Sequence, residues 1–311
     1  MPFAPDAPIA GKRVLLTGAS GFVGRHVLVS GLDGAFAGAE FIALPAVDVR
    51  DREALQRELR GVRPDHVIHL AAQSFVPRSF EDPAETIEIN VLGTLNLLQA
   101  LDSDGFSGRF LYVSSGDVYG TVSESRLPVD EDLPPAPRNP YAVSKVAAEQ
   151  LCLQWHRSNR LDVVIARPFN HVGPGQGRSF VVPALAEQVV AVASGRQAPT
   201  ISAGDIDVTR DFTDVRDVVC AYANLLVSGN AGKIYTVGSG IERSVRDILH
   251  RLLELAGTEA DVLQDPAKFR PAEQRRMVAD SSLIRQETGW TPRIPWDQTL
   301  VDILEDMESK A

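Results

Sequence analysis

Three side chains near the middle of the sequence could together act on a carbonyl group: Ser115, Tyr141 and Lys145. Tyr141 and Lys145 are four residues apart in a predicted helix, so both project from one helix face. A free tyrosine titrates near pH ~10, and a neighbouring ammonium favours its phenolate, which brings the hydroxyl towards useful acid–base strength. Ser115 ends a predicted strand, at the edge where open α/β sheets bind ligands. The set predicts a site that polarises a carbonyl and transfers a proton to or from its oxygen.

A glycine-rich loop near the N-terminus predicts a phosphate-binding turn. It follows an apolar strand pattern directly and opens a helix pattern, which is the context that a dinucleotide-binding loop requires. Glycines let the backbone turn tightly and approach a pyrophosphate, which then lies on the positive helix N-terminus. The loop residues expected to contact the cofactor are Gly18, Ser20, Gly21, Phe22, Val23, Gly24 and Arg25.

The residues after the second predicted strand bear on the choice of cofactor. NAD-binding folds place an acid there to bind the adenosine 2′-hydroxyl, but residues 43–46 read Ala-Leu-Pro-Ala. Arg25 is a cation that could meet a 2′-phosphate instead, although a solvated helix arginine is the alternative interpretation. These residues favour NADP(H) and leave NAD(H) open.

Strand and helix patterns alternate through the first half of the chain. Strands are predicted at 13–18, 41–44, 66–72, 109–115 and 161–168, with helices between them. This alternation indicates parallel βαβ units with right-handed crossovers, and so an α/β fold with a Rossmann-type doubly wound parallel sheet.

The pattern becomes irregular after Pro168, which predicts a second part of the molecule. We expect an NAD(P)-binding domain over residues 1–168, joined by part of 208–240. We expect a smaller C-terminal α/β substrate lobe formed by 169–207 and 241–311. Within it, 181–195 is predicted to be a helix and 210–227 a loop leading into a helix.

The predicted helix at 83–103 is apolar on more than one face. One stripe comprises Ile87, Val91, Leu95 and Leu98, and another comprises Ile89, Leu92 and Leu97. A helix that covers a sheet needs only one such stripe. The second indicates either deep burial or a helix-pair interface, and we expect a homodimer.

Composition excludes several classes of partner. The net charge of −10 and the pI of about 5.1 disfavour nucleic acid and anionic membranes. No apolar run reaches the roughly 18 residues that span a bilayer, and the first residues do not resemble a secretion signal, so a cytoplasmic protein is expected. Cys152 and Cys220 are interpreted as small buried hydrophobes in a reducing compartment. His66 and His69 lie on opposite faces of a strand, so no shared metal is expected.

Taken with these patterns, the sequence resembles the extended short-chain dehydrogenase/reductase family over nearly its whole length. That family pairs a GxxGxxG loop with YxxxK, as Gly18, Gly21, Gly24, Tyr141 and Lys145 do here. The segments RPFNHVGPGQ (167–176), RDFTDVRDV (210–218), RPAEQRRMVAD (270–280) and TGWTPRIP (288–295) are similar to its nucleotide-sugar branch. SSGDVYG, PFNHVGPGQ and RPAEQRR resemble bacterial GDP-4-keto-6-deoxy-D-mannose reductases, which form GDP-D-rhamnose.

The resemblance implies further contacts of the cofactor and of a nucleotide-sugar substrate. Lys145 would also hold the nicotinamide ribose, and arginines are the usual forked partners of a diphosphate. The implied cofactor residues are Asp48, Val49, Leu70, Ala71, Ala72 and Pro168, and the implied substrate residues are Ser74, Asp117, Asn170, Val181, Arg210, Arg270 and Glu273.

SSGDVYG at 114–120 narrows the reaction within that branch. A 4,6-dehydratase needs extra acid–base groups beside the tyrosine, and related dehydratases carry an Asp-Glu or Ser-Glu pair there. Here the pair is Gly116 and Asp117. Gly116 cannot donate a proton, and a reductase needs neither group. We therefore expect NAD(P)H-dependent reduction at C4 of a GDP-linked 4-keto-6-deoxy sugar. A 4-epimerase or 4,6-dehydratase of the same family, and a non-catalytic NADP sensor, are the alternatives.

Overall fold

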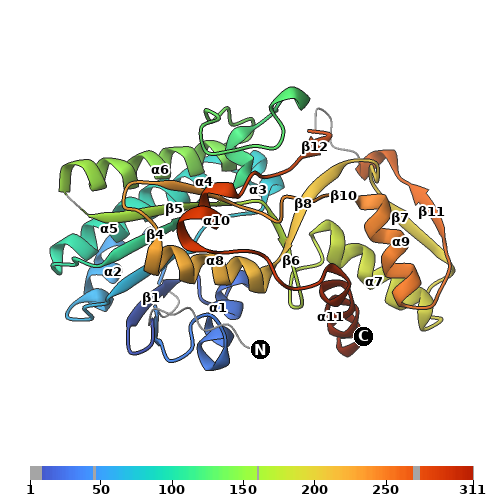
Figure 1. Cartoon of the computed structure of the whole chain (residues 1–311), viewed down its shortest axis with the longest axis horizontal. Coiled ribbons are helices and arrows are strands. Elements are labelled where there is room, and N and C mark those ends of the chain that lie inside the picture. The colour runs from blue at the N-terminus through green and yellow to red at the C-terminus, as the bar shows by residue number, and fades with distance from the viewer. Residues whose placement is uncertain (1–8, 45–46, 160, 269–273, 311) are drawn as a thin grey trace.

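The computed structural model describes residues 9–44, 47–159, 161–268 and 274–310. A larger lobe around a parallel sheet adjoins a smaller lobe that contains the C-terminal helix (Figure 1). No helix within these ranges is both long enough and apolar enough to cross a membrane.

Six parallel strands form the sheet of the larger lobe. Its order is β2-β1-β3-β4-β5-β9, so the chain moves outward on one side of β1 and then on the other. Open α/β sheets bind ligands outside the carboxyl ends of the strands where this order reverses, here between β1 and β3. The strands are β1 (Arg13–Thr17), β2 (Glu40–Ala43), β3 (His66–His69), β4 (Arg109–Val113), β5 (Asp162–Pro168) and β9 (Ile234–Val237).

Helices cover both faces of this sheet, as the alternation of patterns predicted. On β1, Leu15 packs into the core on one face, whereas Val14 and Leu16 pack into the core on the other. Both faces are apolar because side chains alternate along a strand and each face is covered. The first face carries α2 (Arg52–Leu59), α5 (Gly93–Ser103) and α6 (Pro140–Asn159), and the second carries α1 (Phe22–Asp33), α8 (Val215–Ser228) and α10 (Ser282–Thr288).

The helix predicted at 83–103 is interrupted by a π-helical turn, Glu88–Leu92, between α4 (Pro83–Ile87) and α5; α3 (Val76–Glu81) precedes it. Most of its second apolar stripe is explained by burial within the chain. Leu97 is fully buried and Ile89 packs against the same core, whereas Leu92 is 48% exposed. Only Leu92 of that stripe is left to face a partner.

The smaller lobe has its own sheets and core. Strand β8 (Thr209–Asp214) lies between β10 (Glu242–Ser244) and β12 (Arg276–Met277) and also pairs with β6 (Asn170–Val172); β7 (Thr200–Ala203) pairs with β11 (Asp261–Gln264). The apolar faces of its helices pack into one separate core. These helices are α7 (Val181–Ala193), α9 (Val245–Leu255) and α11 (Trp296–Ser309).

Two predictions about the second half of the chain need correction. Residues 209–214 are the central strand β8, not a loop, since strands distant in sequence supply their pairing partners. The return of α8 and β9 to the large sheet agrees with the predicted crossing of 208–240. However, α10 and Trp290 also pack in the core of the larger lobe, and the Trp290 indole donates to Asp217 O at 2.9 Å. The stretch 241–311 is therefore shared between the lobes.

Candidate active site

The carboxyl ends of β4 and β5 position Ser115. Val113 pairs with Ala166 at the end of the ladder, and the Ser114 N–H donates to Ala166 O at 2.8 Å. Ser115 then caps a short 3₁₀ turn, Gly116–Tyr119, because its Oγ accepts a hydrogen bond from the Asp117 N–H at 3.2 Å. The cap fixes the serine hydroxyl at the sheet edge where a ligand is expected.

Helix α6 brings Tyr141 and Lys145 to the same edge. Asn139 Oδ1 accepts a hydrogen bond from the Ala142 N–H at 2.7 Å, and Pro140 is tolerated in the first turn, so the helix begins just before the tyrosine. The Tyr141 hydroxyl is hydrogen-bonded to Ser115. Lys145 Nζ donates to Val113 O at 2.8 Å and lies 5.9 Å from the centroid of the Tyr141 ring. The structure thus brings the three predicted catalytic residues together.

Burial dominates the charge states of these groups. It raises the pKa of Tyr141, the Asp117 carboxylate adds to the rise, and the Ser115 hydrogen bond acts in the opposite direction. The expected lowering of this pKa by Lys145 is therefore not observed. The phenol is protonated at neutral pH, which is the form that can protonate an alkoxide. Burial also lowers the pKa of Lys145 to about 8, against the opposing charge of Glu149.

Gly116 is glycine for a packing reason that the sequence did not reveal. A Cβ built on Gly116 would lie 3.0 Å from Cδ2 of the Phe169 ring. Phe169 is 5% exposed and packs against Tyr119 with ring centroids 6.2 Å apart, so the ring has little room to move. A side chain at position 116 would therefore crowd an aromatic ring from the loop after β5.

We predict that Gly116→Asp lowers both stability and reductase turnover and does not create dehydratase activity. Overpacking of a buried site typically costs about 1–3 kcal/mol, so the unfolding temperature should fall and turnover should drop about 10-fold. Thermal unfolding and product analysis of Gly116→Asp, Phe169→Ala and the double variant form the test. In the double variant the cost of the aspartate should be smaller. An unchanged unfolding temperature in Gly116→Asp alone would contradict this packing argument.

The glycine loop forms a cradle in which side chains do not fit. A Cβ on Gly18, which has φ +70°, would lie 2.8 Å from Ala71 N, and one on Gly24 would lie 2.3 Å from Gly18 O. Gly21 is the N-cap of α1 and supplies no side-chain cap, so backbone N–H groups of the first turn face the loop. A helix N-terminus with so close a backbone approach fits the pyrophosphate of a dinucleotide.

Arg25 has partners other than the expected 2′-phosphate. Its guanidinium donates to Ser20 O at 2.6 Å and to Gly175 O at 3.0 Å. The next residue, His26, contacts Pro174 O through Nε2 at 2.9 Å. These contacts tie the first turn of α1 to the loop after β6. They give Arg25 a structural role between the lobes and do not support the role in cofactor choice.

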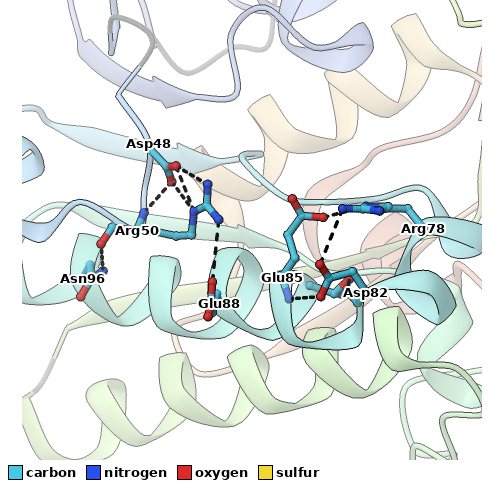
Figure 2. Close-up of polar contacts among 8 residues, drawn as sticks. Asp48, Arg50, Arg78, Asp82, Glu85, Glu88 and Asn96 are labelled. Carbon is cyan, nitrogen blue, oxygen red and sulfur yellow. Dashed lines mark hydrogen bonds and ion pairs between the residues drawn. The ribbon is translucent and has the colours of Figure 1, made fainter.

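The predicted adenine contacts, Asp48 and Val49, lie in the loop after β2. Figure 2 shows Arg50 between Asp48 and Glu88, with its forked guanidinium on the Asp48 carboxylate. The Arg50 hydrogen bonds lower the pKa of Asp48. Val49 is 7% exposed, and a Cβ on Gly93 would lie 2.5 Å from its Cγ2. The loop is therefore held closely against the π-helical turn and α5.

A buried polar network at the site was not identified from the sequence. Asn90, in the π-helical turn, donates through Nδ2 to Gln73 O at 3.0 Å and to Ser144 Oγ at 2.8 Å, and accepts from the Gln73 N–H at 2.8 Å. Ser144 lies between Tyr141 and Lys145. The network therefore fixes Gln73, which directly follows the predicted cofactor residues Leu70, Ala71 and Ala72, relative to the YxxxK turn.

His69 extends this network to the phosphate loop. Its Nδ1 contacts Thr17 Oγ1 at 2.7 Å and its Nε2 contacts Thr94 Oγ1 at 3.0 Å. Burial, with the Lys145 charge adding to it, lowers the pKa of His69 to about 3, so the ring is neutral. The only feature of the sequence that pointed to this buried polar network was the polar Asn90 within the apolar run INVLGT.

The predicted substrate residues lie on several elements beyond the carboxyl edge. Ser74 and Asp117 are exposed beside β3 and β4, Asn170 is exposed at the start of β6, and Val181 is 42% exposed at the start of α7. Arg210, on β8, donates to Thr209 O at 2.7 Å. Pro168, predicted to contact the cofactor, is buried at the end of β5. Arg270 and Glu273 lie outside the described residues, so their placement stays a prediction.

Comparisons with known proteins agree with this geometry. The family profile described as GDP-mannose 4,6 dehydratase matches residues 32–303. The chain is 50% identical over 300 residues to a GDP-6-deoxy-D-mannose reductase of Pseudomonas aeruginosa, covering 96% of this chain and 98% of that protein. It is 30% identical to a dTDP-glucose 4,6-dehydratase of Streptomyces niveus, covering 94% and 92% of the two chains.

Solved structures give the same fold. The structure of the Pseudomonas aeruginosa protein RMD complexed with NADPH superposes with a TM-score of 0.91 at 49% identity, covering 96% of this chain and 100% of that one. A Thermus thermophilus UDP-glucose 4-epimerase in complex with NAD gives 0.84 at 32% identity, covering 96% and 100%. The predicted Rossmann-type fold with a smaller lobe is confirmed.

Proposed function

Because this chain belongs to the GDP-mannose 4,6-dehydratase family, within the extended short-chain dehydrogenases/reductases, we propose that it reduces GDP-4-keto-6-deoxy-D-mannose to GDP-D-rhamnose with NADPH. The observation that carries this conclusion is the 50% identity to a GDP-6-deoxy-D-mannose reductase along nearly the full length of both chains. The site geometry adds that Ser115, Tyr141 and Lys145 are assembled, while a side chain at position 116 would crowd the Phe169 ring.

The site residues have separate roles in the proposed reduction. When bound, the reduced nicotinamide would supply a hydride for the C4 keto carbon. Ser115 donates a hydrogen bond to the C4 oxygen and Tyr141 gives it a proton, so that no free alkoxide forms. Lys145 keeps a positive charge beside the tyrosine, and Asp117 positions a sugar hydroxyl. Gly18, Gly21 and Gly24 would hold the pyrophosphate at the first turn of α1.

NADPH is the proposed reductant, and NADH is a second one to be compared. The absence of an acid at 43–46 favours NADPH, and the Pseudomonas aeruginosa relative was solved with NADPH. NAD is present in the related epimerase structure. Arg25 does not add support for NADPH, since its guanidinium donates to the carbonyl oxygens of Ser20 and Gly175.

The function is tested by mixing the purified protein with NADPH or NADH and a panel of 4-keto-6-deoxy nucleotide sugars. We expect one equivalent of NADPH to be oxidised per GDP-4-keto-6-deoxy-D-mannose, with GDP-D-rhamnose as the product. A 4-epimerase, which the structural likeness to the Thermus thermophilus enzyme favours as the alternative, would consume no NADPH. Conversion of an unmodified nucleotide sugar, without oxidation of NADPH by any keto sugar, would overturn the proposal.

We also propose that the protein is a cytoplasmic homodimer. Phe80 on α3, Leu92 on the π-helical turn and Val143 on α6 are 63%, 48% and 44% exposed, and α6 packs against each of the other two elements. Exposed large apolar side chains on adjoining helices favour a second copy as the partner. A cytoplasmic location is supported by Cys152 and Cys220, which are both free thiols. Light scattering should give twice the mass of the chain, and the mass of one chain would reject the dimer.

A further inference from the structure

A buried ion pair lies one helical turn beyond Lys145. Glu149 on α6 and Arg167 on β5 are 0% and 2% exposed. Arg167 binds the carboxylate with both arms of its fork, Nε to Oε1 at 2.9 Å and Nη2 to Oε2 at 2.7 Å. Taking two charges out of water is costly even when they are paired. The presence of such a pair is therefore weak evidence for a role in stability.

The same arginine reaches the segment that carries Ser115. Its Nη1 donates to Tyr119 Oη at 3.0 Å, and its guanidinium lies 4.9 Å from the centroid of the Tyr119 ring. Tyr119 is the last residue of the turn that Ser115 caps. Arg167 thus joins the helix that carries Tyr141 and Lys145 to the turn after Ser115. Its own strand, β5, carries none of these three residues.

Lys145 and Glu149, both in the described part of the chain, are four residues apart on one helix but form no direct ion pair. Lys145 Nζ donates instead to Val113 O, while Arg167 binds both oxygens of Glu149. The carboxylate still acts on the lysine through space and opposes the effect of burial on its pKa. Other titratable groups that face this pair are Tyr112, Tyr119, Tyr141, Cys152 and His69. Among the described residues, Glu149 is the one carboxylate whose charge is found to support the ammonium.

We propose that Glu149 is a positioning residue of the reductase: its carboxylate, held by Arg167, keeps the Lys145 ammonium charged and directed at the end of β4. Arg167 also has a role in positioning Lys145. By taking both carboxylate oxygens it prevents Glu149 from pulling the ammonium down the helix, away from Val113 O and from the tyrosine. Loss of the Glu149 charge should therefore lower the pKa of Lys145, whereas loss of the Arg167 fork should raise it.

The test measures the titration of Lys145 directly. The chain has five lysines, Lys12, Lys145, Lys233, Lys268 and Lys310, so NMR of protein labelled at the lysine ε-carbon can follow each one, with Lys145→Arg to assign the signal. In Glu149→Gln, the pKa of Lys145 should fall by about one unit, because an opposite charge is removed. The alkaline limb of the kcat profile should move to lower pH by a similar amount, with the Kd of NADPH little changed.

Arg167→Lys is the second variant and predicts the opposite sign. A lysine keeps the charge but loses the fork, which frees one oxygen of Glu149 to pair with Lys145. The pKa of Lys145 should then rise while kcat falls about 10-fold. This variant also tests the proposal if Glu149→Gln does not fold.

Asp162→Asn is the matched control. Arg109 and Asp162 form an ion pair at 3.0 Å between β4 and β5 at their opposite ends, so this change should lower thermal stability and leave the titration of Lys145 unchanged. A Lys145 that titrates as in the wild type in both Glu149→Gln and Arg167→Lys would overturn the inference. The inference rests on the proposed reductase, but the titration needs no substrate. A wild type that oxidises no NADPH would therefore contradict the proposed function and not the effect on Lys145.

Discussion

Tyr141→Phe lowers kcat by about 100- to 10,000-fold, which is the range expected for loss of a positioned general acid, while the Kd of NADPH stays close to the wild-type value. The hydroxyl is hydrogen-bonded to Ser115, and burial keeps it protonated at neutral pH. Phenylalanine removes that proton donor and preserves the ring packing. The measurement is single-turnover oxidation of NADPH by the keto sugar, with cofactor affinity from NADPH fluorescence.

Tyr112→Phe provides the control for this result. Tyr112 is a buried tyrosine whose ring centroid lies 5.1 Å from Lys145 Nζ, and its hydroxyl has no hydrogen-bond partner among the described residues. Its loss should change kcat by less than about threefold. Comparable rates for Tyr141→Phe and Tyr112→Phe would show that Tyr141 is not the acid.

Gly24→Ala weakens NADPH binding by about 100-fold or more, because a misplacement of about 1 Å in a binding element can cost that much. The new Cβ would lie 2.3 Å from Gly18 O and 2.7 Å from Ala19 Cα. Both are backbone atoms that cannot rotate away, so the loop must move off the start of α1. Titration of NADPH fluorescence, with circular dichroism to confirm folding, gives the change in Kd.

Gly31→Ala is the matched control on the same helix. There the added methyl group meets the ring of Phe41, whose Cε2 would be 2.8 Å away, and that ring is remote in sequence from the phosphate loop. The change should lower thermal stability and leave the Kd of NADPH within about threefold of the wild type. A wild-type Kd in Gly24→Ala would contradict the assignment of this loop to the pyrophosphate.

The sequence predicted those features that depend on the spacing of residues within one segment. The five predicted strands, the glycine turn and the pairing of Tyr141 with Lys145 each follow from a period or a spacing of four residues, and all are found in the structure. The identity of the sugar nucleotide came from resemblance, because no spacing encodes it.

The remaining features depend on contacts between distant residues. Phe169 fills the space beside Gly116 from 53 positions away, and Arg167 reaches Glu149 from another element. The sequence alone allowed Arg25 to be a solvated helix arginine, but in the structure it donates a hydrogen bond to Gly175 O, 150 positions away. The strand nature of 209–214 also depends on partners at 170–172, 242–244 and 276–277. No period within one segment contains this information.

The most direct test of the central claim is to follow one hydrogen from cofactor to sugar. NADPH deuterated at the transferable position of C4 of the nicotinamide is mixed with GDP-4-keto-6-deoxy-D-mannose and the wild-type protein, and the product is analysed by NMR and mass spectrometry. The account predicts GDP-D-rhamnose carrying one deuterium at C4 of the sugar, with one NADPH oxidised per product. A product without deuterium at C4, or sugar conversion without oxidation of NADPH, would contradict it.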